Sequence, residues 1–259
     1  MKTRAVWATR PVASWGGSLR AVALLGALIV GSGTDAVASR SAAAGVAGVG
    51  ASDPPVVELL IELLATGTTP ERATAALRAL AKLADPRGFE AVELYAGHRR
   101  MEVRREAVRA LGALNDARAI PVLLDRLGDD APEVRAAAAE SLAARKEGRA
   151  LPRLLRLLRR DPGVAAPLGQ LATPETIAQL QDLKGSVADG VLATALGAYV
   201  KRADAGDAVR IEALRVLAKL HGPEAATELV EYLASIPARD NRPSRREAQR
   251  LLDERSVDQ

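Results

Sequence analysis

Hydrophobic residues in the middle of the chain recur at steps of three and four, the spacing that brings side chains onto one face of an α-helix. One such set is Val103, Ala107, Val108, Leu111 and Leu114. After a short polar break, a second apolar set occupies residues 120–127. The pattern predicts two short helices joined by a turn, each with a single apolar face.

The same pair of helices recurs after 31 residues. "EVRREAVRALGALNDARAIPVLLDRL" at 102–127 aligns with "EVRAAAAESLAARKEGRALPRLLRLL" at 133–158, and the same step backwards reaches 71–96. Pro121 and Pro152 fall at the same position of their units. Proline is tolerated in the first turn of a helix, where its missing N–H would have no intrahelical partner. We therefore expect both prolines to start the second helix of a pair.

Further units complete the array. Residues 208–233 form a fourth copy that is not on the 31-residue grid, 161–183 form a shorter unit, 187–203 resemble one extra helix, and 244–252 resemble the first half of a unit and a terminal cap. A pair of short helices cannot bury both apolar faces alone, so neighbouring pairs must stack. The expected fold is all-α, a right-handed α-solenoid of stacked antiparallel helix pairs.

The pattern "VR-x-x-A-x-x-A-L" followed by "AIP-x-L" resembles the HEAT-like repeat, particularly the variety first associated with phycobilisome bilin lyases. The resemblance covers roughly residues 55–254. It departs at Arg72 and Ala73, where the Val-Arg pair is absent, and at Ala165, where the arginine is missing. It implies that the arginine after the valine forms a structural ladder, here Arg104, Arg135 and Arg210, with Asp116 and Asp161 as possible partners.

The N-terminus has the features of an export signal. Four basic residues precede the apolar run "AVALLGALIV", which is followed by "AVA" at 36–38. We expect a signal peptide at 1–38, a flexible Gly/Ala/Ser-rich linker at 39–53 and the solenoid at 54–259. The mature protein would be periplasmic or secreted, without stable membrane insertion. An uncleaved N-terminal anchor is the alternative, although the apolar run is shorter than the ~20 residues that span a bilayer.

Composition excludes several kinds of chemistry. The chain has no cysteine, so it has no disulfide, thiolate zinc site or cysteine nucleophile. Its two histidines, His98 and His221, each stand near an expected helix end, and neither has a second histidine at a metal-ligand spacing. We expect both to be solvated or helix-capping residues. With no catalytic constellation, the sequence predicts a protein that is not an enzyme and needs no cofactor or metal.

The resemblance also implies that the second helix of each pair lines the concave face of the solenoid, so that its polar side chains are candidate partner contacts. These are Glu90, Glu93 and Tyr95; Asp125 and Arg126; Arg153, Arg156, Arg159 and Arg160; Gln179 and Asp182; and Glu228, Glu231 and Tyr232. The four arginines suit bidentate contact with carboxylates. We expect them to hold an acidic segment of a partner protein, the alternative being an ordinary solvated face.

Three functions compete on these grounds. The expected one is a non-enzymatic protein-interaction scaffold or adaptor, exported to the cell envelope. The alternative is a bilin lyase or isomerase, which only the kinship of the repeats suggests. Nucleic-acid binding is disfavoured, because removal of 1–38 would leave 32 basic against 31 acidic side chains and few aromatic rings for stacking.

Overall fold

The structure is a computed structural model that describes residues 54–257. This part of the chain is all-α, with thirteen α-helices, three 3-10 turns and no β-strand. The helices are α2 (Pro54–Ala65), α3 (Pro70–Leu83), α4 (Phe89–Tyr95), α5 (Met101–Ala113), α6 (Ala119–Arg126), α7 (Pro132–Ala144), α8 (Leu151–Leu157), α9 (Ala165–Leu171), α10 (Pro174–Asp182), α11 (Asp189–Val200), α12 (Asp207–Ala218), α13 (Pro223–Ala234) and α14 (Pro243–Val257). The predicted signal peptide and linker lie outside the described residues.

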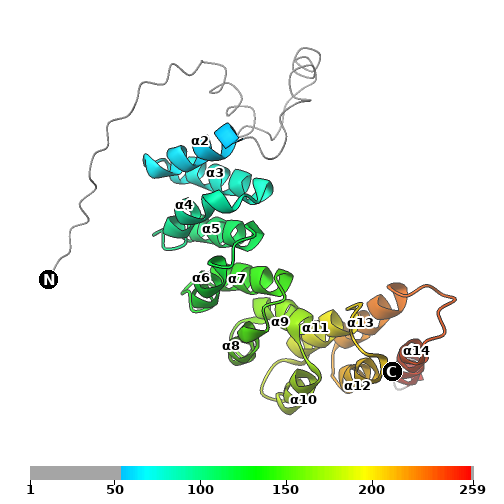
Figure 1. Ribbon diagram of the computed structural model, residues 1–259. Helices are drawn as coiled ribbons and strands as arrows, with labels where there is room; N and C mark the ends of the chain where they lie inside the picture. Colours follow the sequence, from blue (N-terminus) through cyan, green and yellow to red (C-terminus); the bar gives the residue numbers. More distant parts are fainter. Residues whose placement is uncertain (1–53, 258–259) are drawn as a thin grey trace, which may run out of the picture. The chain divides into compact units, whose positions relative to one another are not determined.

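The helices stack in two rows (Figure 1). In the odd row, α3, α5, α7, α9, α11 and α13 each pack on the next. The even row contains α2, α4, α6, α8, α10, α12 and α14. Each of these helices except α10 packs on an odd-row helix, and α10 packs on α12. Successive antiparallel layers of this kind define an α-solenoid, which confirms the predicted fold. No helix in 54–257 is both long enough and apolar enough to cross a membrane.

The core repeats with the sequence period. Leu80, Leu111 and Leu142 stand 31 residues apart, and all three are fully buried between layers. Small residues let the odd-row helices approach closely. At Gly169 in α9, a Cβ atom would lie only 2.0 Å from the carbonyl oxygen of Ala195 in α11. The low aromatic content therefore suits a core of leucine and alanine in closely packed helices.

The second helices begin as predicted. Pro121 lies in the first turn of α6 and Pro152 in the first turn of α8. An acid two residues before an arginine stabilises the turn that leads into each. Asp116 accepts from the backbone N–H of Arg118 at 2.8 Å and also binds its guanidinium. Before α8, hydrogen bonds from Arg149 lower the pKa of Glu147 to about 2.

The predicted arginine ladder is present, with one change of partner. Arg135 pairs with the buried Asp161 at 2.8 Å, as predicted. Arg104 pairs at 2.8 Å with Asp129, which was not among the expected partners, and Asp116 is bound by Arg118 instead of a ladder arginine. Burial alone would raise the pKa of Asp129, but the hydrogen bond from Arg104 holds it below the usual value. The third member, Arg210, donates to the backbone carbonyls of residues 200 and 202.

The extra helix predicted at 187–203 is α11, and it shifts the array by one helix. Up to α10, the first helix of each pair lies in the odd row and the second in the even row. Because α11 is a single helix in the odd row, α12, a first helix by sequence, falls in the even row against α10 and α14. Its partner α13, a second helix by sequence, packs on α11 in the odd row.

Candidate partner-binding surface

The fourteen predicted contact residues do not lie along one row of helices. Eleven belong to the even row: Glu90, Glu93 and Tyr95 on α4, Asp125 and Arg126 on α6, Arg153, Arg156, Arg159 and Arg160 on α8 or directly after it, and Gln179 and Asp182 on α10. The other three, Glu228, Glu231 and Tyr232, are on α13 in the odd row, and Tyr232 is buried rather than available for a contact. The expectation that all second helices present one continuous face is therefore wrong beyond α11, because the single helix exchanges the rows.

Two of the predicted arginines have a structural role. Arg126 donates to the carbonyl oxygen of Ala96 at the end of α4 (3.3 Å), and Arg153 donates to that of Leu124 in α6 (2.7 Å). Tyr95 makes the equivalent contact with the carbonyl of Leu64 in α2, at 2.8 Å. Each side chain reaches back by one layer to a carbonyl that lacks an intrahelical partner at a helix end. These contacts fix the spacing of the even row.

Several predicted carboxylates are already paired. The ammonium of Lys201, the C-cap residue of α11, lies 2.8 Å from both Glu228 and Glu231. Burial would lower the pKa of Lys201, but the hydrogen bonds to these two acids raise it. Glu90 lies 3.5 Å from Arg118, and Asp125 pairs with Arg126. These four carboxylates therefore already take part in ion pairs within the solenoid.

Six of the predicted charged residues have no ion pair among residues 54–257: Glu93, Arg153, Arg156, Arg159, Arg160 and Asp182. Arg153 is engaged by the Leu124 carbonyl, and the other five are exposed. Exposure without an ion pair is also what the alternative, an ordinary solvated face, predicts for Arg156, Arg159 and Arg160. They are cations that only solvent or a partner can neutralise.

The free arginines border a groove between α8 and α10. This groove has a volume of about 370 Å³ and is lined by Leu155, Arg156, Arg159, Gln179 and Leu183. We call it the arginine groove. Leu155 and Leu183 are half-buried, so the groove combines a partly apolar surface with two unpaired guanidinium groups. Sequence reasoning selected the arginines but missed the leucines, since each leucine also fits the apolar face of its own helix.

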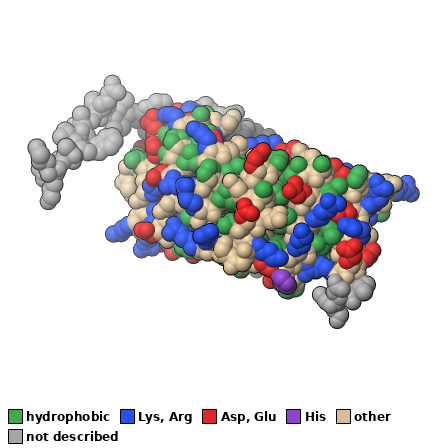
Figure 2. Space-filling view, turned by 90° about the horizontal axis from the view of Figure 1, so that it is seen from below, with side chains coloured by type: hydrophobic (Ala, Val, Ile, Leu, Met, Phe, Trp, Pro, Cys, Tyr) green, Lys and Arg blue, Asp and Glu red, His purple; other side chains and the backbone are tan. Residues whose placement is uncertain are grey.

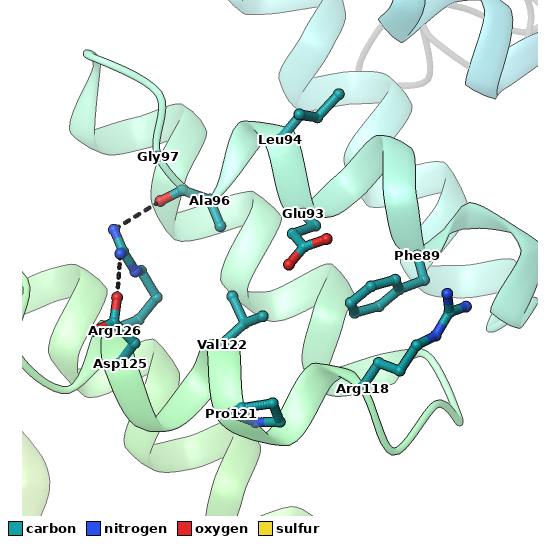
Figure 3. Close-up of a pocket in the computed structure, with 10 residues that line it drawn as sticks. All are labelled: Phe89, Glu93, Leu94, Ala96, Gly97, Arg118, Pro121, Val122, Asp125 and Arg126. Carbon is teal, nitrogen blue, oxygen red and sulfur yellow. Dashed lines mark hydrogen bonds and ion pairs between the residues drawn. The ribbon is translucent and has the colours of Figure 1, made fainter. Parts of the chain in front are cut away.

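A larger groove lies between α4 and α6, with a volume of about 700 Å³. Figure 3 shows the Glu93 side chain directed into it, with Val122 opposite and Phe89 beside the guanidinium of Arg118. The Arg118 guanidinium carbon lies 4.4 Å from the centre of the Phe89 ring. Leu94, also on the lining, is 73% exposed. We call this the α4–α6 groove.

Chemical machinery is sparse in the part of the chain that the structure describes. No group of three or more His, Cys, Asp or Glu residues among residues 54–257 could hold a metal ion. His98 lies in the turn after α4, where its ring stacks on Tyr95 with centroids 5.9 Å apart. His221 lies in the turn before α13, with Nδ1 3.1 Å from an Asp189 carboxylate oxygen.

The surface charge is mosaic. Figure 2 shows basic, acidic and hydrophobic side chains next to one another over the face in view, rather than one continuous basic track. A nucleic-acid backbone requires a run of positive charge along its path. The face in view therefore favours short, separate contacts.

Comparisons with known families identify the repeat. Residues 90–166 match the family model described as HEAT repeats, and residues 209–235 match the model described as PBS lyase HEAT-like repeat. The two matches cover the central units and the fourth copy, α12 and α13. They confirm the resemblance inferred from the Val-Arg and Pro positions. A search among curated proteins gives no significant match.

Comparison with solved structures gives several similar chains of low sequence identity. The complex of CpcE and CpcF of phycocyanin lyase from Nostoc sp. PCC7120 is 21% identical with a TM-score of 0.47, over 76% of this chain and 94% of that chain. A designed armadillo repeat protein is 21% identical with a TM-score of 0.40, over 76% and 98% of the two chains. An engineered protein is 25% identical with a TM-score of 0.39, over 78% and 96%.

Proposed function

We propose that this chain, which is a HEAT-like repeat protein, is a non-enzymatic interaction scaffold that holds an acidic segment of a partner protein in the arginine groove. The observation that carries the proposal is the pair of unpaired arginines, Arg156 and Arg159, beside the leucines of that groove. A solenoid presents an extended surface, and function on such a fold depends on local sites.

The chemistry of the groove favours carboxylates beside an apolar side chain. Arginine binds a carboxylate through two parallel N–H donors, and this bidentate contact is roughly twice as strong as a neutral hydrogen bond. The exposed leucine surface of the groove adds a favourable term when an apolar group covers it. A peptide with Glu and Leu side chains at helical steps would satisfy both requirements.

Charge reversal in the groove tests this function. The probe is a synthetic peptide of alternating Leu and Glu turns, and its affinity is measured by fluorescence anisotropy. In the double variant Arg156→Glu, Arg159→Glu, we expect the affinity to fall at least tenfold. Arg153 is left unchanged, because its contact with Leu124 supports the stack.

The matched control changes the same total charge elsewhere. Arg72 and Arg246 are exposed, have no ion pair among residues 54–257 and lie outside the groove. The double variant Arg72→Glu, Arg246→Glu is expected to lose less than twofold in affinity. Equal losses of affinity in the two double variants would show that only net charge matters, and this would overturn the proposal. Unchanged affinity in the Arg156→Glu, Arg159→Glu variant would overturn it as well.

Export to the cell envelope is part of the proposal. It rests on the basic lead and the apolar run of residues 1–38. Fractionation of cells that express the full chain, with N-terminal sequencing of the product, tests it. We expect a periplasmic or secreted product that starts near residue 39. A cytoplasmic product with an intact N-terminus would contradict export.

A bilin lyase or isomerase is the second candidate, favoured by the match of residues 209–235 to the PBS lyase HEAT-like repeat. Incubation with a bilin and an apo-phycobiliprotein, followed by absorbance spectroscopy, distinguishes the two. A scaffold gives no covalent bilin adduct on the acceptor. Formation of a covalent adduct that depends on this chain would contradict the scaffold function and support a bilin lyase or isomerase.

A further inference from the structure

We infer that the α4–α6 groove is a second binding site, which takes a basic amphipathic segment of a partner protein. It is separate from the arginine groove, which lies between α8 and α10 and shares no lining residue with it. The inference depends on three properties of the groove: its apolar lining, the pairing of its arginines and the free carboxylate within it.

The apolar lining leaves surface to be covered. Leu94 on α4 is 73% exposed, the highest value among the large hydrophobic residues of 54–257. Val122 and Pro121 of α6 lie across the groove from α4, and the mostly buried ring of Phe89 lies at the side of the groove near Arg118 (Figure 3). Burial of apolar surface contributes about 25 cal/mol per Å² removed from water. An apolar side chain of a partner that packs against Leu94 and Val122 would gain binding free energy from this burial.

The two arginines of the groove are already engaged. Arg118 is bound by Asp116, lies near Glu90 and stacks on Phe89. Arg126 is bound by Asp125 and by the carbonyl of Ala96. A partner anion would therefore have to displace existing carboxylates.

The unneutralised charge of the groove is negative. Glu93 projects into it and has no ion pair among residues 54–257 (Figure 3). The neighbouring Asp125, although paired with Arg126, keeps a largely exposed side chain. A lysine or arginine of a partner can reach Glu93 without breaking any contact, whereas an acidic peptide or a phosphate backbone would be repelled.

Basic residues three or four positions from a leucine place charge and apolar surface on one face of a helix. Such a segment matches the single free acid next to the exposed leucine. The even row thus offers an acidic groove at α4–α6 and a basic groove at α8–α10. Between them lies Arg153, whose contact with the Leu124 carbonyl joins α8 to α6.

The test uses the full chain and two synthetic peptides of equal length, one of Leu and Lys turns and one of Leu and Glu turns. We expect Glu93→Lys to lower the affinity for the basic peptide at least tenfold and Leu94→Ser to lower it at least fivefold, measured by fluorescence anisotropy. The affinity of both variants for the acidic peptide should stay within twofold of the wild-type value. Glu93 and Leu94 are both exposed, and circular dichroism verifies that the variants fold.

Matched controls are available in the odd row. Glu140→Lys makes the same charge change at an exposed position of α7, and Val230→Ser removes the other exposed large hydrophobic residue, on α13. Each should change the affinity for the basic peptide by less than twofold. Equal loss in Glu93→Lys and Glu140→Lys, or no binding of the basic peptide to the wild type, would overturn the inference. Failure of the acidic peptide alone would instead count against the proposed function.

Methyl NMR provides a second, site-specific readout. On addition of the basic peptide, the methyl resonances of Leu94 and Val122 should shift, while those of Leu155 and Leu183 should not. The reverse pattern, in which only the arginine-groove methyls respond to the basic peptide, would exclude the α4–α6 groove as its site.

Discussion

At the scale of single residues, buried charges link the layers. Arg135 and Asp161 are both buried, and the guanidinium also donates to the carbonyl oxygens of residues 129 and 130 at 2.9 Å. This one side chain therefore joins α7, the turn before it and the turn after α8. A charge removed from water is tolerated only when its partner and its hydrogen bonds are present.

Arg135→Ala should accordingly destabilise the protein strongly. It leaves Asp161, which is 3% exposed, without its cation, and loss of one member of a buried pair typically costs about 3–5 kcal/mol. Urea unfolding followed by circular dichroism measures the free energy of unfolding. Arg149→Ala is the control, because its pair with Glu147 is exposed and should contribute far less. Similar losses in the two variants would contradict a structural role for the ladder.

The sequence predicted the ladder arginines better than their partners. The Val-Arg pattern selected Arg104 and Arg135 correctly, and Asp161 was correctly assigned. Asp116, the other possible partner, is not part of the ladder, because an acid two residues before an arginine forms a local pair with that arginine, here Arg118. The partner of Arg104, Asp129, is recognised only when the turn after α6 has been placed in space.

At the scale of elements, close packing of α9 on α11 determines how the array continues past the shorter unit. Gly169→Ala should be destabilising, since its Cβ would meet the Ala195 carbonyl oxygen at 2.0 Å and the Ala198 Cβ at 2.9 Å. Overpacking of this kind costs about 1–3 kcal/mol or more. Differential scanning calorimetry should show a lower Tm. In the control Gly206→Ala, nothing lies within 4 Å of the new methyl group, and the Tm should hardly change.

The hydrophobic periodicity predicted where the helices are, but it did not predict in which of the two rows each helix lies. The sequence predicted α11 as an extra helix and placed Pro121 and Pro152 at helix starts. It then grouped Glu228 and Glu231 with the even row, because each unit was counted as a pair. Whether a helix lies in one row or the other depends on the number of helices before it, which no local pattern within 208–233 reveals.

At the scale of the whole described unit, stability is distributed along a stack in which each layer contacts only its neighbours. In the even row, α14 packs on α12, and it also packs on α13. The Arg255 guanidinium donates to the carbonyl oxygens of Ala218 and Leu220 after α12. Such a terminal helix protects the layer below it from solvent.

Deletion of 243–259 should therefore act locally. We expect faster amide hydrogen exchange in α12 and α13, which lose their covering helix, and little change in α3, α5 and α7 at the other end of the stack. Mass spectrometry of peptic fragments measures the exchange. Uniformly faster exchange across all layers would show a single cooperative unit, contrary to the expectation for a stack of neighbours.

The two grooves depended on the three-dimensional arrangement more than on composition. The charged members Glu93, Arg156 and Arg159 could be named from the sequence, since exposed polar positions of a helix follow from its apolar stripe. Their apolar neighbours could not, because Leu94 and Leu155 look like core residues in the repeat pattern. Only the neighbouring helix shows which leucines stay in contact with water.

The unpaired helix α11 also constrains anyone who lengthens this protein by copying repeats. A 31-residue unit duplicated before α11 would add its second helix beside α4, α6 and α8, and so extend the surface that carries both grooves. The same 31-residue unit inserted after α13 would place its first helix in the even row and its second helix in the odd row, on the opposite side of the stack. One solitary helix thus makes the two ends of the molecule inequivalent as attachment points.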